Sequence, residues 1–212
     1  MIDNKQKVVL VLAPHTDDGE LGCGATIAKF CDEGYDVYYV AFSICSKSLP
    51  SGLHPQTLAV EVANATKVLG VKNENLILFD FDVRRFKEFR QDILEELIKI
   101  KTKLNPDIVF VPSPSDIHQD HQVISEEGLR AFKNCSILGY EMPWNNVSFN
   151  TRSFIKLDEK YVQKKIDSLL EYKSQGHRTY LNADFIKSLA TIRGVQIGCK
   201  YAEAFEVIRW II

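Results

Sequence analysis

The sequence predicts an α/β fold: a Rossmann-like, doubly wound, mostly parallel sheet with helices on both faces, in a single domain spanning residues 1–212. Short apolar runs alternate along the chain with longer amphipathic segments, which is typical of βαβ units. The first run, Val8–Ala13, is apolar at every position, as a strand covered by helices on both faces requires. No repeat, low-complexity tract or Gly/Ser-rich linker divides the chain.

The first elements are defined by apolar runs and by the glycine that ends a helix. Val8–Ala13 (VVLVLA) is the first expected strand, and residues 20–33 are expected to form a helix. Gly34 ends this helix, because glycine readily adopts the left-handed conformation that follows many helices. Residues 36–43 (DVYYVAFS) form a second β-rich run.

The middle of the chain repeats the same alternation. A helix is expected over about residues 56–69, ended by Gly70, and a short strand over residues 76–79. Residues 88–104 are the clearest amphipathic helix. Its apolar residues recur at steps of three and four: Phe89, Ile93, Leu97, Ile100 and Leu104. Asn-Pro follows this helix and ends it, and residues 107–111 (DIVFV) begin the next strand.

The last third of the chain continues with helices and strands after a loop and a further helix. Asp158 is expected to cap a helix that runs to about Tyr172, and a final helix spans about residues 183–193. The remaining expected strands are residues 137–141, 154–157 and 204–210.

The composition excludes several classes of protein. The chain has 212 residues, 26 Lys and Arg against 28 Asp and Glu, and a formal charge of −2, which argues against nucleic-acid binding through a broad basic face. Its 45% hydrophobic and 25% charged residues are typical of a globular domain and exclude disorder. No apolar run reaches the roughly 18 residues needed for a membrane span.

The cysteines and the N-terminal segment predict a cytoplasmic protein. The apolar run near the N-terminus is short and is followed at once by acidic residues, unlike a signal peptide. The five cysteines are scattered and form no C-x-x-C pair, so we expect reduced thiols. They are Cys23, Cys31, Cys45, Cys135 and Cys199.

Two loops concentrate the polar chemistry. Residues 14–20 (PHTDDGE) directly follow the first strand, and residues 115–121 (SDIHQDH) follow the strand that begins at residue 107. The carboxyl ends of parallel strands share one edge of the sheet, where ligands bind in such folds. Three of the five histidines and five acids lie in these loops: His15, His118, His121, Asp17, Asp18, Glu20, Asp116 and Asp120.

This set of side chains favours a metal site. Two acidic loops that converge would repel each other unless a cation lay between them. Imidazole and carboxylate groups are the ligands expected for zinc, and three protein ligands with an open fourth position make a catalytic site. Each residue alone is more simply explained as a helix cap or a solvated charge, but two such loops after buried strands reverse this preference.

Other site types fit less well, although one stays open. Gly22 and Gly24 resemble part of a dinucleotide-binding motif, but Ile27 stands at the third glycine position and the acidic loop would repel a pyrophosphate. No P-loop and no G-x-S-x-G sequence occurs. A two-metal phosphoesterase remains the alternative, although such a site needs about seven or eight ligating groups and these loops supply roughly six.

At a larger scale the sequence resembles a known family. PHTDDGELGCGATIA is similar to the P-H-x-D-D-x-E signature of the PIG-L/LmbE-like family of metal-dependent N-deacetylases, and HQDH is similar to its H-x-D-H motif. The resemblance implies that residues 1–212 form one such domain on a Rossmann-like fold. It continues in order through Glu61, Ala65, Leu69-Gly70, Tyr172-Lys173-Ser174-Gln175, Arg193-Gly194 and Tyr201-Ala202-Glu203-Ala204-Phe205.

The resemblance also implies a role for each residue of the two motifs. Three residues become the metal ligands: His15, Asp18 and His121. Asp17 becomes the general base. His118 is similar to the family histidine that stabilises the oxyanion or protonates the leaving amine, and Asp120 to the residue that orients it. Zn²⁺ is the implied ion, and another divalent ion such as Fe²⁺ suits the same ligands.

The implied activity is that of a zinc-dependent hydrolase acting on a linear amide. It removes an acetyl group from an N-acetylated sugar or sugar conjugate, with metal-activated water and Asp17 as general base. The implied partner is this small-molecule sugar, with no nucleic acid and no membrane span, and a homo-oligomer is compatible with the sequence. Thr16, Gly19 and Leu58 replace the usual Pro, Glu and substrate-binding Arg of the family, and the change at Leu58 leaves the particular sugar undetermined.

Five further residues lie outside these motifs. Trp144 could form a sugar-stacking wall or simply cover the core. Arg84 and Arg85 could bind a phosphate or carboxylate of the substrate, with a solvated basic pair as the simpler interpretation. His54 and His177 are expected to be surface or capping histidines, because neither has other ligand residues around it.

Overall fold

The structure is a computed structural model that describes residues 6–176 and 178–211, so the expectation for His177 lies outside the described residues. Its strands are β1 (Val8–Ala13), β2 (Asp36–Ala41), β3 (Leu76–Leu78), β4 (Ile108–Pro112), β5 (Ser136–Tyr140), β6 (Ser153–Leu157) and β7 (Tyr201–Arg209). Its helices are α1 (Asp18–Asp32), α2 (Thr57–Leu69), α3 (Arg90–Leu104), α4 (Gln119–Ala131), α5 (Glu159–Leu169) and α6 (Ala183–Val195), with 3₁₀ turns at Asn73–Asn75 and Lys173–Gln175.

The strands of the described residues form one sheet in the order β3-β2-β1-β4-β5-β7-β6. Strands β3, β2, β1, β4 and β5 are parallel, and β7 runs antiparallel between β5 and β6. The chain builds outward from β1 to β3, then returns to the other side of β1 with β4. This reversal confirms the doubly wound, mostly parallel fold, and it places the topological switch point between β1 and β4.

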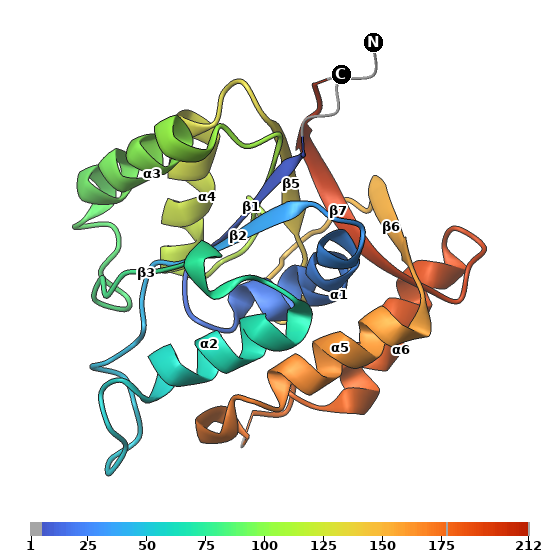
Figure 1. Ribbon diagram of the computed structural model, residues 1–212, viewed down its shortest axis with the longest axis horizontal. Coiled ribbons are helices and arrows are strands. Elements are labelled where there is room, and N and C mark those ends of the chain that lie inside the picture. The colour runs from blue at the N-terminus through green and yellow to red at the C-terminus, as the bar shows by residue number, and fades with distance from the viewer. Residues whose placement is uncertain (1–5, 177, 212) are drawn as a thin grey trace.

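Helices cover both faces of the sheet (Figure 1). Helices α3 and α4 pack together on one face, and α1, α2, α5 and α6 form the layer on the other. Strand β1 contributes to both cores: Val9, Val11 and Ala13 pack under α1, whereas Leu10 and Leu12 pack under α3 and α4. This two-sided burial is why every position of β1 is apolar.

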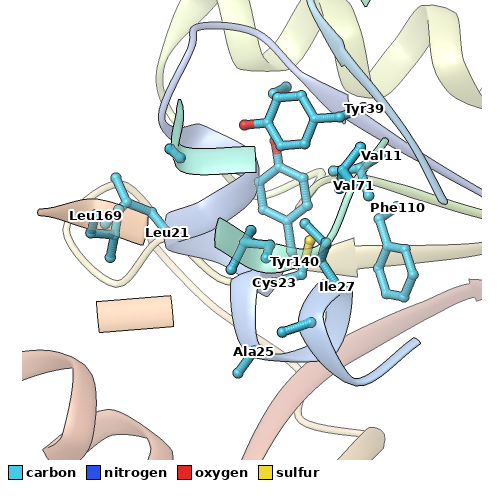
Figure 2. Packing of buried hydrophobic residues seen from close by; sticks show 14 of the residues in the cluster. Val11, Leu21, Cys23, Ala25, Ile27, Tyr39, Val71, Phe110, Tyr140 and Leu169 are labelled. Carbon is cyan, nitrogen blue, oxygen red and sulfur yellow. The ribbon is translucent and has the colours of Figure 1, made fainter. Parts of the chain in front are cut away.

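Two glycines let the start of α1 lie directly against large tyrosines of the sheet. A Cβ atom at Gly19 would overlap the Tyr39 ring, and one at Gly22 would overlap the Tyr140 ring. Both rings are fully buried, and Figure 2 shows Tyr39 and Tyr140 in the core beside α1. The Tyr140 hydroxyl donates to the carbonyl of Leu12, 3.0 Å away, at the end of β1. The absence of a side chain at Gly19 is therefore a packing requirement.

Helix α1 is kinked at Cys23, whose φ of −145° and ψ of 24° are not helical. The kink frees backbone groups, and a buried ion pair satisfies them. Glu203 accepts hydrogen bonds from the amides of residues 25–26, at 3.2 and 2.7 Å. Lys165 donates to the carbonyl of Leu21 at 2.6 Å and to Glu203 at 2.7 Å. The pair therefore connects α5 and β7 to the helix that follows the first polar loop.

The expected helices and strands are present, but some of them begin or end at other residues than the sequence predicts. Helix α5 ends at Leu169 rather than near Tyr172, because the Tyr172 side chain turns inward toward the first polar loop. Asp158 stands at the N-cap of α5, but its side chain makes no capping hydrogen bond, so the expected cap is wrong in this detail. Strand β7 begins at Tyr201 rather than at residue 204, because it pairs with β6 from Leu157 onward.

Other helix ends lie within two residues of the expected positions or agree with them. Helix α1 begins at Asp18, two positions before the expected start, and Gly34 has the positive φ of 85° that ends it. Gly70 likewise ends α2 with a φ of 98°. Among the described residues, no helix is both long enough and apolar enough to cross a bilayer.

Candidate active site

The two polar loops meet at the carboxyl ends of β1 and β4. These strands are neighbours in the sheet, so the loop that leads from β1 into α1 faces the loop that leads from β4 into α4. His15 Nε2 lies 3.0 Å from Asp120 Oδ2, and His121 Nε2 lies 3.2 Å from Asp18 Oδ2. The loops therefore touch through four side chains, although about a hundred residues separate them in the sequence.

One group of side chains has the arrangement of a metal-binding triad. His15, Asp18 and His121 each offer one ligand atom, and these atoms all lie within 4.8 Å of one another. Asp18 Oδ2 is central, at 3.1 Å from His15 Nδ1 and 3.2 Å from His121 Nε2. Two imidazoles and one carboxylate, with Asp18 and His121 buried, are a donor set that suits zinc and leaves a position open.

The outward-facing nitrogen of each histidine in this triad contacts a carboxylate. His15 Nε2 lies 3.0 Å from Asp120 Oδ2, and His121 Nδ1 lies 2.7 Å from Asp116 Oδ2. Such carboxylate partners fix the tautomer and the ring orientation of histidines that ligate metals. Sequence reasoning noted Asp116 only as one of the loop acids. Its position in the motif, five residues before His121, is the signal that could have identified this role.

Asp120 is held from the other side by the loop that follows β3. The backbone amides of Arg84 and Phe86 donate to its carboxylate, at 2.6 and 3.4 Å. Arg84 has a φ of 67°, an uncommon backbone conformation for a residue other than glycine. In this conformation its amide faces Asp120. The carboxylate of Asp120 thus contacts His15. Its link to His118 is a backbone one, through the Asp120 amide.

His118 is placed as the N-cap of α4. Its Nδ1 accepts a hydrogen bond from the Asp120 amide at 3.2 Å, so the neutral ring carries its proton on Nε2. Burial lowers the pKa of His118, and the positive charge of His121 and His15 lowers it further. His118 is therefore a neutral histidine that offers an N–H donor, and it lines the same pocket as the triad.

The triad behaves as a tightly coupled charge cluster. Burial alone raises the pKa of Asp18, but His121 and His15 outweigh it and hold this pKa well below its usual range. For His121, burial lowers the pKa, but the negative charge of Asp18 and the hydrogen bond with Asp116 raise it to about 10. Asp18 is therefore ionised at neutral pH, as a metal ligand must be.

Asp17 directly precedes Asp18 of the triad, and its side chain makes no hydrogen bond to the backbone of the helix. It occupies the N-cap position of α1 but makes no capping hydrogen bond, and it lines the pocket while only 8% exposed. Burial raises the pKa of Asp17, the charge of Asp18 raises it further, and the charge of Arg178 opposes both. Such a carboxyl group suits proton transfer.

Glu20 belongs to the frame of the loop. Tyr172 donates to Glu20 at 2.8 Å and also lies 2.7 Å from the carbonyl of Thr16, and Tyr39 hydrogen-bonds the same two residues. Burial raises the pKa of Glu20 to about 8. Glu20 is fully buried behind the loop, so it holds the loop in place without facing the pocket.

A pocket of about 290 Å³ opens over the triad. Its lining joins residues from seven segments of the chain: His15, Thr16, Asp17, Asp18, Leu21, Cys45, Ser48, Leu58, Val83, His118, His121, Trp144, Asn145, Gln175, Arg178 and Tyr180. Trp144 stacks on Tyr180, with ring centroids 4.2 Å apart and planes inclined by 9°. Sequence reasoning did not single out Arg178 and Tyr180, which follow the Tyr172–Gln175 motif by only a few residues.

The other residues considered from the sequence lie outside this pocket. The Arg85 side chain pairs with Glu88 and Asp82 on the surface, at 2.9 and 3.4 Å. Arg84 contributes its backbone amide, as described above. His54 is exposed and accepts a hydrogen bond from the Gln56 amide, 3.1 Å away, just before α2.

A second cluster of possible ligands overlaps the first. His15, His118 and Asp120 also offer three atoms within 4.8 Å. This cluster shares His15 with the triad, and the Asp120 carboxylate is already used by His15 and by the amide of Arg84. The described residues therefore favour one ion in this pocket over two.

Comparisons with known proteins find a family and several relatives described as deacetylases. The family described as GlcNAc-PI de-N-acetylase (PIG-L) matches residues 10–132. The uncharacterized deacetylase YaiS of Escherichia coli (strain K12) is 30% identical over 176 residues, which cover 81% of this chain and 93% of that protein. The diacetylchitobiose deacetylase of Thermococcus kodakarensis is 25% identical over 229 residues, which cover 97% of this chain and 84% of that protein.

A solved structure shares the fold over most of both chains. The N,N'-diacetylchitobiose deacetylase from Pyrococcus horikoshii superposes with a TM-score of 0.75 and 22% sequence identity, over 95% of this chain and 84% of that one. At this identity the likeness supports the fold, and the assignment of chemistry depends on the residues of the pocket.

Proposed function

The chain belongs to the PIG-L family, and from this premise we propose that it is an N-deacetylase that uses one divalent metal ion to remove an acetyl group from an N-acetylated sugar or sugar conjugate. The observation that carries the proposal is the triad of His15, Asp18 and His121 with Asp17 beside it in one pocket. The names of the relatives support the sugar: two of them are diacetylchitobiose deacetylases.

The donor set of the triad fits a zinc ion. Both histidines present one nitrogen to Asp18 and hold the other against a carboxylate, so their orientation does not depend on the ion. A divalent ion, when bound by His15, Asp18 and His121, lowers the pKa of water from 15.7 toward about 7 and polarises an amide carbonyl. Zinc is the ion that we propose, and Fe²⁺ would suit the same ligands.

Asp17 is the proposed general base. Its carboxyl group is free of capping hydrogen bonds and lines the pocket next to Asp18. The raised pKa of Asp17 lies closer to neutral pH than that of an ordinary aspartate. Asp17 can therefore accept a proton from the attacking water and return one to the departing amine. Adjacent side chains at the start of a helix point in different directions, so Asp18 ligates while Asp17 moves the proton.

His118 is the proposed oxyanion donor. Its Nδ1 already accepts a backbone hydrogen bond, so its Nε2–H is the group left to face the carbonyl oxygen of the amide. A fixed donor of this kind stabilises the negative charge that develops as the amide is attacked. Asp120 and Asp116 act indirectly, because they position His15 and His121 through the contacts described above.

Two further expectations remain predictions of the sequence. The scattered cysteines predict a cytoplasmic location, and the sequence is compatible with a homo-oligomer. Fractionation of cells and measurement of the mass in solution would test them.

The test of this function is a substrate panel read against metal content. Metal-loaded protein is incubated with N-acetylglucosamine glycosides, N,N'-diacetylchitobiose and a set of phosphate monoesters, and released amine and phosphate are measured. The expected result is amine release from at least one N-acetyl sugar, with one metal ion bound per chain. Phosphate release with two ions per chain and no amine release would replace this proposal by a two-metal phosphoesterase.

A further inference from the structure

The start of helix α1 lacks the side-chain cap that its sequence could provide. Asp17 occupies the N-cap position, where an aspartate usually accepts a hydrogen bond from the amide of the second or third residue of the helix. These amides belong to Gly19 and Glu20, because α1 begins at Asp18. The Asp17 carboxyl group accepts neither of them. Another group must therefore satisfy the amides at the start of this buried helix.

Two other helices of the chain show the arrangement that α1 lacks. Asn182 caps α6 in an extended conformation, with φ −123° and ψ 150°, and its side chain accepts from the Phe185 amide at 2.8 Å. His118 caps α4 with φ −70° and ψ 123°. Asp17 instead has φ −97° and ψ −8°, which lies in the helical region. The backbone of Asp17 therefore differs from that of the two residues whose side chains cap a helix.

The Gly19 amide is bound by a tyrosine of the sheet. It donates to the hydroxyl of Tyr39 in β2, 3.0 Å away. The same hydroxyl lies 2.8 Å from the carbonyl oxygen of Thr16 and also hydrogen-bonds Glu20. This close approach requires glycine, because a Cβ atom at residue 19 would lie only 2.7 Å from the hydroxyl oxygen. Tyr39 thus accepts the hydrogen bond that a capping side chain would accept.

The peptide groups on both sides of Asp17 are held in place. The carbonyl of Thr16 lies 2.8 Å from the Tyr39 hydroxyl and 2.7 Å from the Tyr172 hydroxyl. Because the peptide bond is planar, a fixed Thr16 carbonyl also fixes the direction of the Asp17 amide. The Asp17 carbonyl accepts from the Leu21 amide at 3.0 Å. Asp17 can therefore reach the extended conformation of a capping residue only if some of these hydrogen bonds break.

We propose that Tyr39 is a positioning residue for Asp17: its hydroxyl caps α1 in place of the aspartate and leaves the Asp17 carboxyl group free to face the pocket. This inference rests on the proposed deacetylase function, in which Asp17 is the general base. A carboxyl group that capped the helix would be turned toward the helix amides and hydrogen-bonded to them. Tyr39 acts only through Asp17, since it is fully buried and is not among the residues that line the pocket.

Tyr172 offers a matched comparison. It is also fully buried, and its hydroxyl contacts the same two residues of the loop, Thr16 at 2.7 Å and Glu20 at 2.8 Å. Of the two tyrosines, Tyr39 is the one that accepts from the Gly19 amide. If these hydroxyls only stabilise the loop, loss of either one should have a similar effect. If the cap positions Asp17, loss of the Tyr39 hydroxyl should have much the larger effect.

The test removes one hydroxyl at a time, and phenylalanine keeps the buried ring in place. Amine release is measured on the N-acetyl sugar that the metal-loaded parent protein hydrolyses. Tyr39→Phe is expected to lower kcat about 10- to 100-fold, because the base is displaced, with KM within about 2-fold and one metal ion still bound per chain. Tyr172→Phe should lower kcat less than about 3-fold. Equal losses of kcat in the two variants would overturn the inference. Tyr161→Phe should change neither constant, because its hydroxyl binds Asp32 outside the pocket, at 2.7 Å.

Crystal structures of the variants give a second measurement that needs neither metal nor activity. In Tyr39→Phe the Asp17 carboxyl group is expected to turn toward the Gly19 amide and accept its hydrogen bond, whereas in Tyr172→Phe it should stay in place. An Asp17 side chain that keeps its position in Tyr39→Phe would overturn the inference, whatever the rate. If the parent protein hydrolyses no N-acetyl sugar, the proposed function fails, and the structure of Tyr39→Phe still decides whether Tyr39 keeps Asp17 free.

Discussion

The inner and outer ends of the pocket are held in place by different means. At the inner end, His15 lies in the loop after β1, Asp18 begins α1 and His121 lies in the first turn of α4. Each of these side chains contacts at least two other polar side chains. At the outer end, Trp144 and Arg178 lie on connections between elements, are exposed, and have few polar partners. The side chains at the inner end are therefore held by several direct polar contacts, whereas those at the outer end have few polar contacts of their own.

This difference implies a division of labour. Catalytic groups must keep their geometry within a fraction of an ångström, and the proposed ones lie just after strand ends and contact carboxylates such as Asp116 and Asp120. Recognition groups on connections can change without disturbing the sheet. We therefore expect substitutions at the inner end to affect kcat or metal content, and substitutions at the outer end to affect KM.

The largest expected effect comes from Asp17→Asn. It should lower kcat about 10²- to 10⁴-fold, because it removes the general base, while bound metal stays at one ion per chain. The neighbouring Asp18→Asn is the contrast, since it removes a ligand and should lose the metal as well. Metal analysis and amine release measure both. Undiminished amide hydrolysis in Asp17→Asn would break the proposed roles at the inner end.

The next effect concerns the frame behind the inner end. Lys165→Met should lower the free energy of unfolding by about 3–5 kcal/mol, because it leaves the Glu203 carboxylate buried without its partner. The double variant Lys165→Met/Glu203→Gln should recover part of this loss, since no unpaired charge remains. Urea denaturation followed by circular dichroism measures both variants. A double variant that is less stable than Lys165→Met would contradict this explanation.

A smaller effect is expected from the outer partner of His121. Asp116→Asn keeps the size of the side chain but weakens its hold on the His121 ring, so metal affinity should fall about 10- to 100-fold. Competition with a chelator measures the affinity. Asp92→Asn, at an exposed position of α3, should leave it unchanged. If Asp116→Asn binds metal as tightly as the parent protein, Asp116 does not position His121.

The smallest effect is expected at the outer end. Trp144→Ala removes half of the stacked pair and should raise KM about 2- to 10-fold with kcat within about 2-fold, since stacking contributes equally to substrate and transition state. Steady-state kinetics measure the two constants. The control is Trp210→Ala, because Trp210 is exposed and far from the pocket in sequence and structure. A fall in kcat without a change in KM would place Trp144 in the chemistry instead.

Much of the architecture could be predicted from local patterns. The alternation of apolar runs and amphipathic helices, together with the all-apolar β1, predicted the parallel sheet, and the two polar loops were predicted to meet at its edge. The end of α5 at Leu169 was not predicted, because nothing near Tyr172 shows that its hydroxyl will bind Thr16 and Glu20. That contact spans more than 150 residues of sequence.

No local sequence pattern predicted the residues at the outer end of the pocket. Trp144 was ambiguous, and Arg178 and Tyr180 stand in a short connection with no periodicity. Their proximity to the triad depends on the turn that Ser174 and Glu61 hold together, a contact between segments more than 100 residues apart.

The sequence by itself determined which polar side chains meet at the edge of the sheet, because each motif is a short run that follows a strand whose apolar pattern is visible locally. The tertiary structure decided how these side chains are paired. It placed the Asp120 carboxylate against His15 and left only the Asp120 amide to contact a ring nitrogen of His118, and it showed Asp116 as the partner of His121. Pairings of this kind depend on the adjacency of β1 and β4 and on side-chain packing, which contacts between distant segments determine.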